Sequence, residues 1–287
     1  MTRAFLRAAM VAGLALASLP APQRAWAEPT QLKSGQTRLN GNLEMPVGKK
    51  LADGVALIVH SALSDAKQGL VVALQQNLKK RGIASLAITL SRGIDNREGP
   101  RACGLLHDYA LAGTQREIAA WMAWLRAGGA PTIDLIGFSR GGTQIAELAP
   151  KLSRVGRVVL IAPLFATSAE RAETYQRDYG HPISKPLADA NEYPLQKMTV
   201  DFLGCRDAHV LGATFLDAYR ERLPQLAAET THPTLVVIAG KDEAVPNLAQ
   251  KLPSQVQKVV IDGSGHFFPD LYGEEAADAI AKFLKNE

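Results

Sequence analysis

Runs of apolar residues long enough for strands alternate along the chain with segments whose apolar residues recur at helical spacing. The strand candidates are nearly continuous in Val, Ile, Leu and Ala, as expected for strands covered on both faces. They are residues 55–60, 84–90, 132–138, 157–163, 234–240 and 257–263. The helical patterns cover residues 66–81, 109–127, 143–153 and 272–285. Strand followed repeatedly by helix predicts an α/β domain with a mainly parallel sheet flanked by helices.

Two segments depart from this rhythm. Residues 36–48 hold Asn40-Gly41 between two strand-like halves, which predicts an antiparallel hairpin at one edge of the sheet. Residues 164–231 contain no evident strand, and "SAERAETYQRDYG" and "ATFLDAYRERL" within them have helical patterns. Because this segment is too long for an ordinary crossover, we expect a helical cap inserted over the strand ends. A long disordered loop is the alternative, and its Leu, Phe and Tyr content argues against it.

The N-terminus has the pattern of a secretory signal peptide. Two arginines precede an apolar stretch too short to span a bilayer, and the small residues Ala25 and Ala27 follow as an A-x-A cleavage site. We therefore predict a signal peptide over residues 1–27 and a mature domain over residues 28–287, in a protein that is periplasmic or secreted. A retained membrane anchor is the alternative.

Cleavage also changes the charge of the protein. The formal net charge is +4, but residues 1–27 contain three arginines and no acidic residue, which leaves +1 for the mature chain. This balance favours neither a nucleic-acid partner nor a membrane surface. No second stretch approaches the length of a transmembrane helix, so we expect no stable membrane anchor after cleavage.

The chain contains two cysteines, Cys103 and Cys205. An even count in an exported protein favours a disulfide, with two buried free thiols as the alternative. Since Cys205 lies in the predicted cap and Cys103 in the loop over residues 91–108, the bond would pin the cap to that loop.

A serine between glycines marks the candidate chemistry. Ser139 lies in "GFSRGG", a G-x-S-x-G pattern at the corner between a predicted strand and a predicted helix. A serine nucleophile needs a base and a group that orients the base. His266 in "GSGHFF" and Asp242 in "KDEAVP" each follow a later strand, with Glu243 and Asp262 as competing acids. The sequence thus predicts the triad Ser139, Asp242 and His266 at the carboxyl ends of the strands.

These three motifs, in this order, resemble those of the α/β-hydrolase superfamily over roughly residues 50–287. The resemblance implies an oxyanion hole formed by two backbone N–H groups, one of them from Arg140 directly after the nucleophile. The second would come from the loop after residues 55–60. Many relatives have His-Gly there, whereas this chain has His60 and Ser61. We expect the second donor to be Ala62, with Ser61 as the alternative.

No metal or cofactor is expected. The remaining histidines lack metal-ligand spacing such as H-E-x-x-H, and the chain has no P-loop or dinucleotide fingerprint. They are His60, His107, His181, His209 and His232. We interpret them as non-catalytic, although His60 lies beside the expected oxyanion loop.

The loop over residues 91–108 carries charges of both signs. Arg92, Arg97 and Arg101 are interleaved with Asp95 and Glu98. This pattern favours a solvated loop with local ion pairs. Contact between the arginines and an anionic substrate is the alternative.

Together these features predict an exported serine hydrolase that cleaves a carboxylic ester of a small-molecule acyl substrate through an acyl-enzyme. The same triad also serves amidases, peptidases and acyltransferases, which remain alternatives. A binding protein that keeps the fold without the activity is the non-enzymatic alternative.

Overall fold

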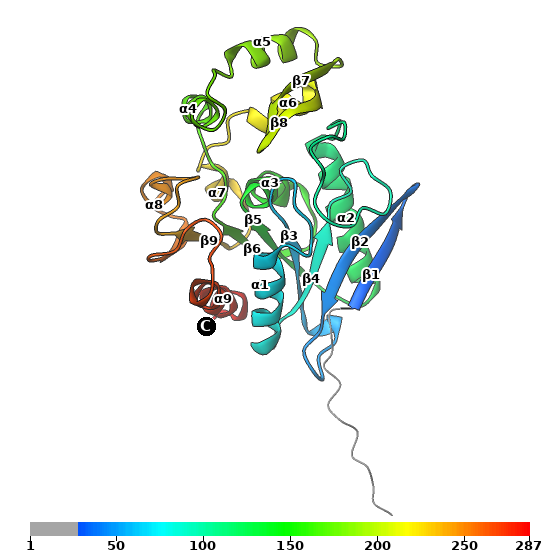
Figure 1. Cartoon of the computed structure of the whole chain (residues 1–287). Coiled ribbons are helices and arrows are strands. Elements are labelled where there is room, and N and C mark those ends of the chain that lie inside the picture. Colours follow the sequence, from blue (N-terminus) through cyan, green and yellow to red (C-terminus); the bar gives the residue numbers. More distant parts are fainter. Residues whose placement is uncertain (1–27) are drawn as a thin grey trace, which may run out of the picture.

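The computed structural model describes residues 28–287, and the predicted signal peptide over residues 1–27 lies outside them. An eight-stranded sheet stands between layers of helices (Figure 1). Its strand order is β1-β2-β4-β3-β5-β6-β9-β10, and the strands from β4 to β10 are parallel. The strands are β1 (Glu28–Ser34), β2 (Thr37–Glu44), β3 (Val55–Val59), β4 (Ala84–Thr89), β5 (Ile133–Phe138), β6 (Val155–Ile161), β9 (Thr234–Ala239) and β10 (Gln257–Ile261). The predicted α/β class is confirmed.

Helices cover both faces of the sheet. Helices α1 (Gly69–Lys80) and α9 (Leu271–Lys285) pack on one face. The other face carries α2 (Leu111–Ala127), α3 (Arg140–Leu148), α7 (Leu226–Glu229) and α8 (Leu248–Lys251). Short 3₁₀ helices span Leu51–Asp53 and Ala149–Lys151. Within residues 28–287, no helix is both long and apolar enough to cross a bilayer.

The central strands are apolar throughout because each of them feeds two cores. In β3, Val55, Leu57 and Val59 pack with the helices of one face, and Ala56 and Ile58 pack with those of the other. Successive side chains of a strand point to opposite sides of the sheet, so a strand covered by helices on both faces has no solvent-exposed face that would carry polar residues.

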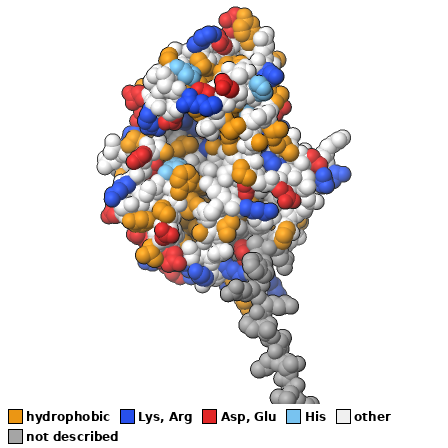
Figure 2. Space-filling view, in the orientation of Figure 1, with side chains coloured by type: hydrophobic (Ala, Val, Ile, Leu, Met, Phe, Trp, Pro, Cys, Tyr) orange, Lys and Arg blue, Asp and Glu red, His pale blue; other side chains and the backbone are white. Residues whose placement is uncertain are grey.

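At the surface, basic and acidic side chains are interspersed on the face drawn in Figure 2.

The N-terminal hairpin forms the edge of the sheet, but its turn is not where the sequence indicated. Strands β1 and β2 are antiparallel and turn at Gly35, which has φ 61°. Asn40-Gly41 lies inside β2 and pairs with β4. A Cβ on Gly41 would lie 3.0 Å from the Ala87 carbonyl oxygen and 3.5 Å from the Trp121 ring. The glycine therefore allows close packing under Trp121 and does not form the turn.

Residues 164–231, which we call the cap, lie over the carboxyl ends of the strands (Figure 1). The cap contains the expected helices, but it also contains a two-stranded antiparallel sheet that the sequence analysis did not predict. Its main elements are α4 (Ser168–Tyr179), α5 (Ser184–Glu192), β7 (Lys197–Phe202), β8 (Cys205–Leu211) and α6 (Gly212–Tyr219). Tyr175, Phe202 and Phe215 are buried in a core that belongs to the cap itself.

Candidate active site

Ser139 occupies the corner between β5 and α3. Its backbone has φ 57° and ψ −119°, a strained conformation for a residue with a side chain. Glycines at either side allow the strand and the helix to approach: a Cβ on Gly137 would lie 2.4 Å from the Gly141 carbonyl oxygen, and one on Gly141 would lie 2.5 Å from that of His60. The corner thus lifts the Ser139 hydroxyl above the carboxyl end of β5.

The structure brings the predicted triad residues together. His266, in the loop between β10 and α9, has its Nε2 atom 2.9 Å from Ser139 Oγ. Its Nδ1 atom is 2.8 Å from Asp242 Oδ2. Asp242, in the loop after β9, is buried, whereas Glu243 and Asp262 are exposed. The three side chains therefore form a continuous chain of hydrogen bonds from hydroxyl to carboxylate.

Backbone contacts hold the acid and the histidine in place. The Oδ1 atom of Asp242 accepts hydrogen bonds from the N–H groups of Ala244 at 2.8 Å and Val245 at 3.1 Å. The Lys241 N–H donates to the Ser264 carbonyl at 2.7 Å and so ties the Asp242 loop to the His266 loop. Only Oδ2 of the carboxylate thus faces the imidazole.

The expected oxyanion donors lie on the two sides of this corner. Arg140 is the first residue of α3, so its N–H has no acceptor within the helix. In the loop after β3, the N–H and hydroxyl of Ser61 are both directed at Gln68 Oε1, at 3.4 and 3.2 Å. Ala62 instead lines the cavity described below. This arrangement favours Ala62 over Ser61 as the second donor.

His60 lies beneath that loop and is fully buried. Its Nε2 atom accepts a hydrogen bond from the Leu90 N–H at 3.1 Å, and an Arg97 guanidinium nitrogen lies 3.3 Å from the same atom. Because both partners are donors, the ring proton resides on Nδ1, which is 2.7 Å from the Ser61 carbonyl oxygen. Burial, followed by the charges of Arg92 and Arg97, holds the pKa of His60 well below its usual value. The ring is therefore neutral.

The prediction of a solvated, locally paired loop over residues 91–108 was wrong for its arginines. Arg92, Arg97 and Arg101 are buried, with exposed fractions of 4–5%. Their guanidinium groups donate mainly to backbone carbonyl oxygens. Asp95 and Glu98 pair outside the loop, with Arg38 and Lys67, and one ion pair lies inside it, between Arg101 and Asp108 at 3.9 Å. Carbonyl partners leave no signature in a sequence, so the spacing of charges did not reveal these contacts.

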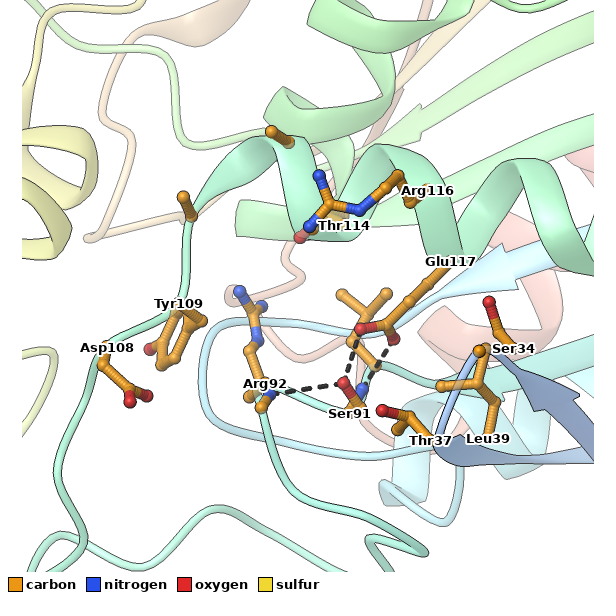
Figure 3. A pocket seen from close by; sticks show the side chains of 16 residues that line it. Ser34, Thr37, Leu39, Ser91, Arg92, Asp108, Tyr109, Thr114, Arg116 and Glu117 are labelled. Atoms are coloured by element: carbon orange, nitrogen blue, oxygen red, sulfur yellow. Dashed lines mark hydrogen bonds between the residues drawn. The ribbon is translucent and has the colours of Figure 1, made fainter.

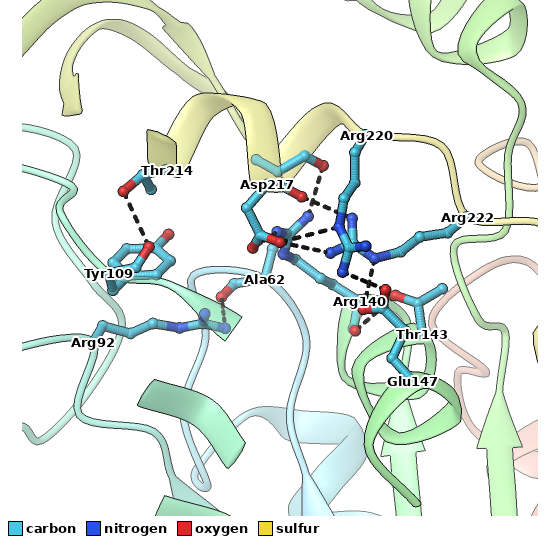
Figure 4. Close-up of polar contacts among 11 residues, drawn as sticks. Ala62, Arg92, Tyr109, Arg140, Thr143, Glu147, Thr214, Asp217, Arg220 and Arg222 are labelled. Atoms are coloured by element: carbon cyan, nitrogen blue, oxygen red, sulfur yellow. Dashed lines mark hydrogen bonds and ion pairs between the residues drawn. The ribbon is translucent and has the colours of Figure 1, made fainter. Parts of the chain in front are cut away.

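One edge of the cap is joined to the same loop. Cys103 and Cys205 form a disulfide with a Cα–Cα distance of 5.4 Å. Beside it, His107 forms a β-bridge with Val210, and the Thr214 hydroxyl donates to the Tyr109 carbonyl at 3.0 Å (Figure 4). The disulfide thus links the cap to a loop that follows β4.

A buried ionic network joins the other edge of the cap to α3 (Figure 4). The Arg140 guanidinium donates to the Ala218 carbonyl at 2.9 Å and lies 3.6 Å from the Asp217 carboxylate. Arg222 pairs with Asp217 at 3.1 Å and with Glu147, on α3, at 3.0 Å. Burial lowers the pKa of Arg140 to about 10, so it remains a cation at neutral pH.

A cavity of about 410 Å³ lies between the cap and the loops that carry Ala62, Ala244 and Phe267. Its lining includes Ala62, Ala244, which is two residues after Asp242, and Phe267, which directly follows His266, but none of the three triad residues. Its walls are rich in aromatic side chains, which are Phe165, Tyr175, Tyr179, Tyr219 and Phe267. The part of the cavity lined by these rings therefore suits an apolar or aromatic group, although Arg171, Arg177 and Asp178 also line it.

A larger cavity, of about 590 Å³, lies between the β1–β2 turn and the first turns of α2 (Figure 3). Its lining includes neither Ser139 nor His266. In it, the Glu117 carboxylate accepts hydrogen bonds from the N–H and hydroxyl of Ser91, at 2.7 and 2.5 Å. These bonds anchor the start of the loop over residues 91–108 to α2.

Among the described residues, no three His, Cys, Asp or Glu side chains are grouped to bind a metal ion.

The chain belongs to the alpha/beta hydrolase family, whose sequence model matches residues 56–283. No curated protein matches the sequence. Among solved structures, Est1E from Butyrivibrio proteoclasticus is 20% identical, with a TM-score of 0.66 over 90% of this chain and 98% of its own. An esterase from Pyrococcus furiosus is 15% identical, with a TM-score of 0.61 over 91% of each chain. A complex of Est1E with ferulic acid has a TM-score of 0.67. At these identities the likeness establishes the shared fold.

Proposed function

We propose that the protein is an exported serine esterase that uses Ser139, His266 and Asp242 as its catalytic triad. The observation that carries this proposal is the unbroken hydrogen-bonded chain from Ser139 Oγ through His266 to Asp242, with links of 2.9 and 2.8 Å. Family membership and the strained corner at Ser139 support it independently. The disulfide supports export, since such bonds persist in oxidising compartments.

In the proposed reaction, Ser139 Oγ attacks the acyl carbon while its proton passes to His266 Nε2. Asp242 accepts the Nδ1–H bond and stabilises the imidazolium that forms. The N–H groups of Arg140 and Ala62 bind the negative oxygen of the tetrahedral intermediate. His266 then returns the proton to the departing alcohol, and an acyl-enzyme remains. Water, deprotonated by His266, attacks the acyl-enzyme in the same way and releases the carboxylic acid.

The cavity beneath the cap, which the loops of Ala62, Ala244 and Phe267 help to line, supports esters that carry an apolar or aromatic group. Its volume of about 410 Å³ accommodates a substituted aromatic ring, and aromatic side chains form much of its wall. Est1E, which shares the fold, binds the aromatic acid ferulic acid. We therefore expect aryl and arylalkenyl esters to react faster than acetyl esters of the same alcohol.

The test is covalent labelling of the disulfide-bonded protein, residues 28–287, with a fluorophosphonate, followed by mass spectrometry of the adduct. Labelling on Ser139 is expected, with loss in S139A and retention in S168A, which removes an exposed serine of the cap. Hydrolysis of 4-nitrophenyl acetate and of 4-nitrophenyl ferulate, which share the alcohol, then ranks the two acyl groups. Folded protein that takes no label would reject the proposed activity and favour a binding protein with this fold.

A further inference from the structure

Three consecutive carbonyl groups of the loop after β3 are bound by the arginine-rich loop after β4. Arg92 Nη2 donates to the Ala62 carbonyl at 3.0 Å (Figure 4), and Arg97 Nη2 donates to that of Ser64 at 2.8 Å. Between them, the backbone N–H of Arg101 donates to the Leu63 carbonyl at 2.7 Å. The carbonyl side of the loop over residues 62–64 is therefore fully engaged by residues 92–101.

The same arginine-rich loop also controls the peptide that precedes Ala62. Arg97 and the Leu90 N–H both donate to His60 Nε2, which leaves the ring proton on Nδ1. That proton faces the Ser61 carbonyl oxygen at 2.7 Å. In a trans peptide the carbonyl and the following N–H point in opposite directions, so the Ala62 N–H points away from the buried His60 ring.

The loop that carries Ala62 also lies against the corner that carries Ser139. A Cβ on Gly141, two residues after Ser139, would lie 2.5 Å from the His60 carbonyl oxygen and 2.6 Å from that of Val59. This contact leaves little room for the loop to shift. A change in the direction of the Ser61–Ala62 peptide would therefore act directly on the space in front of Ser139.

We propose that Arg97 and His60 are positioning residues that direct the Ala62 N–H toward the oxyanion, while Arg92 holds the next carbonyl in place. This inference rests on the proposed esterase function. It explains how a loop with Ser61 in place of the usual glycine keeps a preformed donor. The buried guanidinium groups set the loop conformation through carbonyl contacts, and glycine flexibility is not required.

The cost of burying Arg97 fits this role. Burial and the neighbouring charge of Arg92 lower its pKa to about 10, so the group stays charged in a setting that disfavours charge. Its donors are directed to the carbonyl oxygens of Leu90 at 2.7 Å, Gly99 at 2.5 Å and Ser64, as well as to His60. No carboxylate is hydrogen-bonded to it, so the hydrogen bonds of its side chain all go to the loops around the site.

The first test is the tautomer of His60, read from the ¹⁵N chemical shifts of its ring in the wild-type protein. The proton is expected on Nδ1, and a proton on Nε2 would overturn the inference. This measurement needs no variant and no activity, so it remains decisive even if the esterase proposal fails.

The second test compares Arg97→Met with Arg38→Met. Arg38 is an exposed arginine that binds Asp95 of the same loop but touches neither His60 nor the Ala62 loop. Removal of an oxyanion donor costs about 10²–10³ in kcat, so its misdirection in R97M is expected to cost about 10–100-fold. The losses should occur in kcat and in the fluorophosphonate labelling rate, with KM unchanged within about twofold.

In R38M both rates should stay near those of the wild type. If R97M folds and labels at the wild-type rate, the inference is wrong; if wild-type Ser139 takes no label, it is the proposed function that fails. Should R97M not fold, R97K, which keeps the charge but cannot reach all these acceptors, is expected to fold and to show the same loss in kcat. A kcat for R97K equal to that of the wild type would also overturn the inference.

Discussion

The Asp242→Asn substitution tests the proposed acid, because the structure dictates how the new amide would lie. Asp242 Oδ1 accepts hydrogen bonds from two backbone N–H groups, those of Ala244 and Val245. These two donors favour an oxygen at that position, so the amide NH₂ is expected to face His266 Nδ1. An NH₂ group cannot accept the Nδ1 proton, so the imidazole would move its proton to Nε2. In that tautomer His266 cannot take the proton of Ser139.

The magnitude follows from two competing arrangements. The wrong tautomer costs about 10⁴ in kcat, or about 5.5 kcal/mol at about 1.36 kcal/mol per tenfold. The amide could instead rotate and keep its oxygen toward His266, but the N–H groups of Ala244 and Val245 would then face NH₂. Two buried donors without acceptors cost about 1–3 kcal/mol each. Even the rotated amide, at about 2 kcal/mol or more, predicts a loss in kcat of at least about 30-fold, so the expected loss is about 30-fold to 10⁴-fold.

The assay is kcat for a 4-nitrophenyl ester, together with circular dichroism to verify the fold. Glu243→Gln is the matched control, since it makes the same chemical change at the adjacent, exposed acid. It should retain wild-type kcat. Retention of more than a tenth of kcat in D242N, or an equal loss in E243Q, would refute the assignment of Asp242.

Three further predictions concern stability. The double variant C103S/C205A removes a disulfide that spans 102 residues. Urea unfolding should show a free energy of unfolding lower by about 2–4 kcal/mol, with about 4.7 kcal/mol as the entropic limit. A loss under about 1 kcal/mol would contradict this. Gly137→Ala places a Cβ 2.4 Å from the Gly141 carbonyl oxygen. Thermal unfolding should show a melting temperature lower by several degrees, which corresponds to a loss of about 1–3 kcal/mol in the free energy of unfolding. An unchanged melting temperature would contradict the close packing of β5 against α3 at this glycine. Burial lowers the pKa of His107 from 6.5 to about 4. Between these values only the unfolded chain binds the proton, so the free energy of unfolding should fall as pH falls through this window. His107→Phe should reduce that slope, and an identical slope would count against the burial of a neutral ring.

The fold could be predicted from the sequence wherever local pattern and burial agree. The run over residues 132–138 became Ile133–Phe138, because a strand between two helical layers is apolar at nearly every position. The prediction failed where a dipeptide typical of turns lies inside a strand. Asn40-Gly41 has the composition of a turn, but Gly41 is a site of close approach to Trp121, a contact between residues far apart in the chain.

The strands of the cap were missed although a signal was present. In β7, Met198, Val200 and Phe202 alternate with polar residues, which is the period of a half-buried strand. The turn Leu203-Gly204 then reverses the chain into β8. The helical patterns on either side of this short alternation led to the prediction of a helical cap.

The candidate triad could be predicted because each member follows a strand, and parallel strands end at one edge of the sheet. The contacts that support it could not. Arg97 reaches the site through carbonyl oxygens, which every residue carries, so no residue type marks its partners. The direction of a backbone N–H is likewise a property of the fold and not of the side chain at that position.

The cap is fastened at two opposite edges, and this limits how it can move. On one side the Cys103–Cys205 bond is covalent. On the other, separation from α3 would break the pairs Arg140–Asp217 and Arg222–Glu147, and a single broken buried pair costs about 3–5 kcal/mol. Large opening of the cap as a lid is therefore costly at both edges. Because the Arg140 side chain enters the cap while its N–H is a proposed oxyanion donor, a displacement of the cap would also displace the donor. We therefore expect the cap and the corner at Ser139 to move together, so that the shape of the cavity beneath the cap limits which substrates can enter.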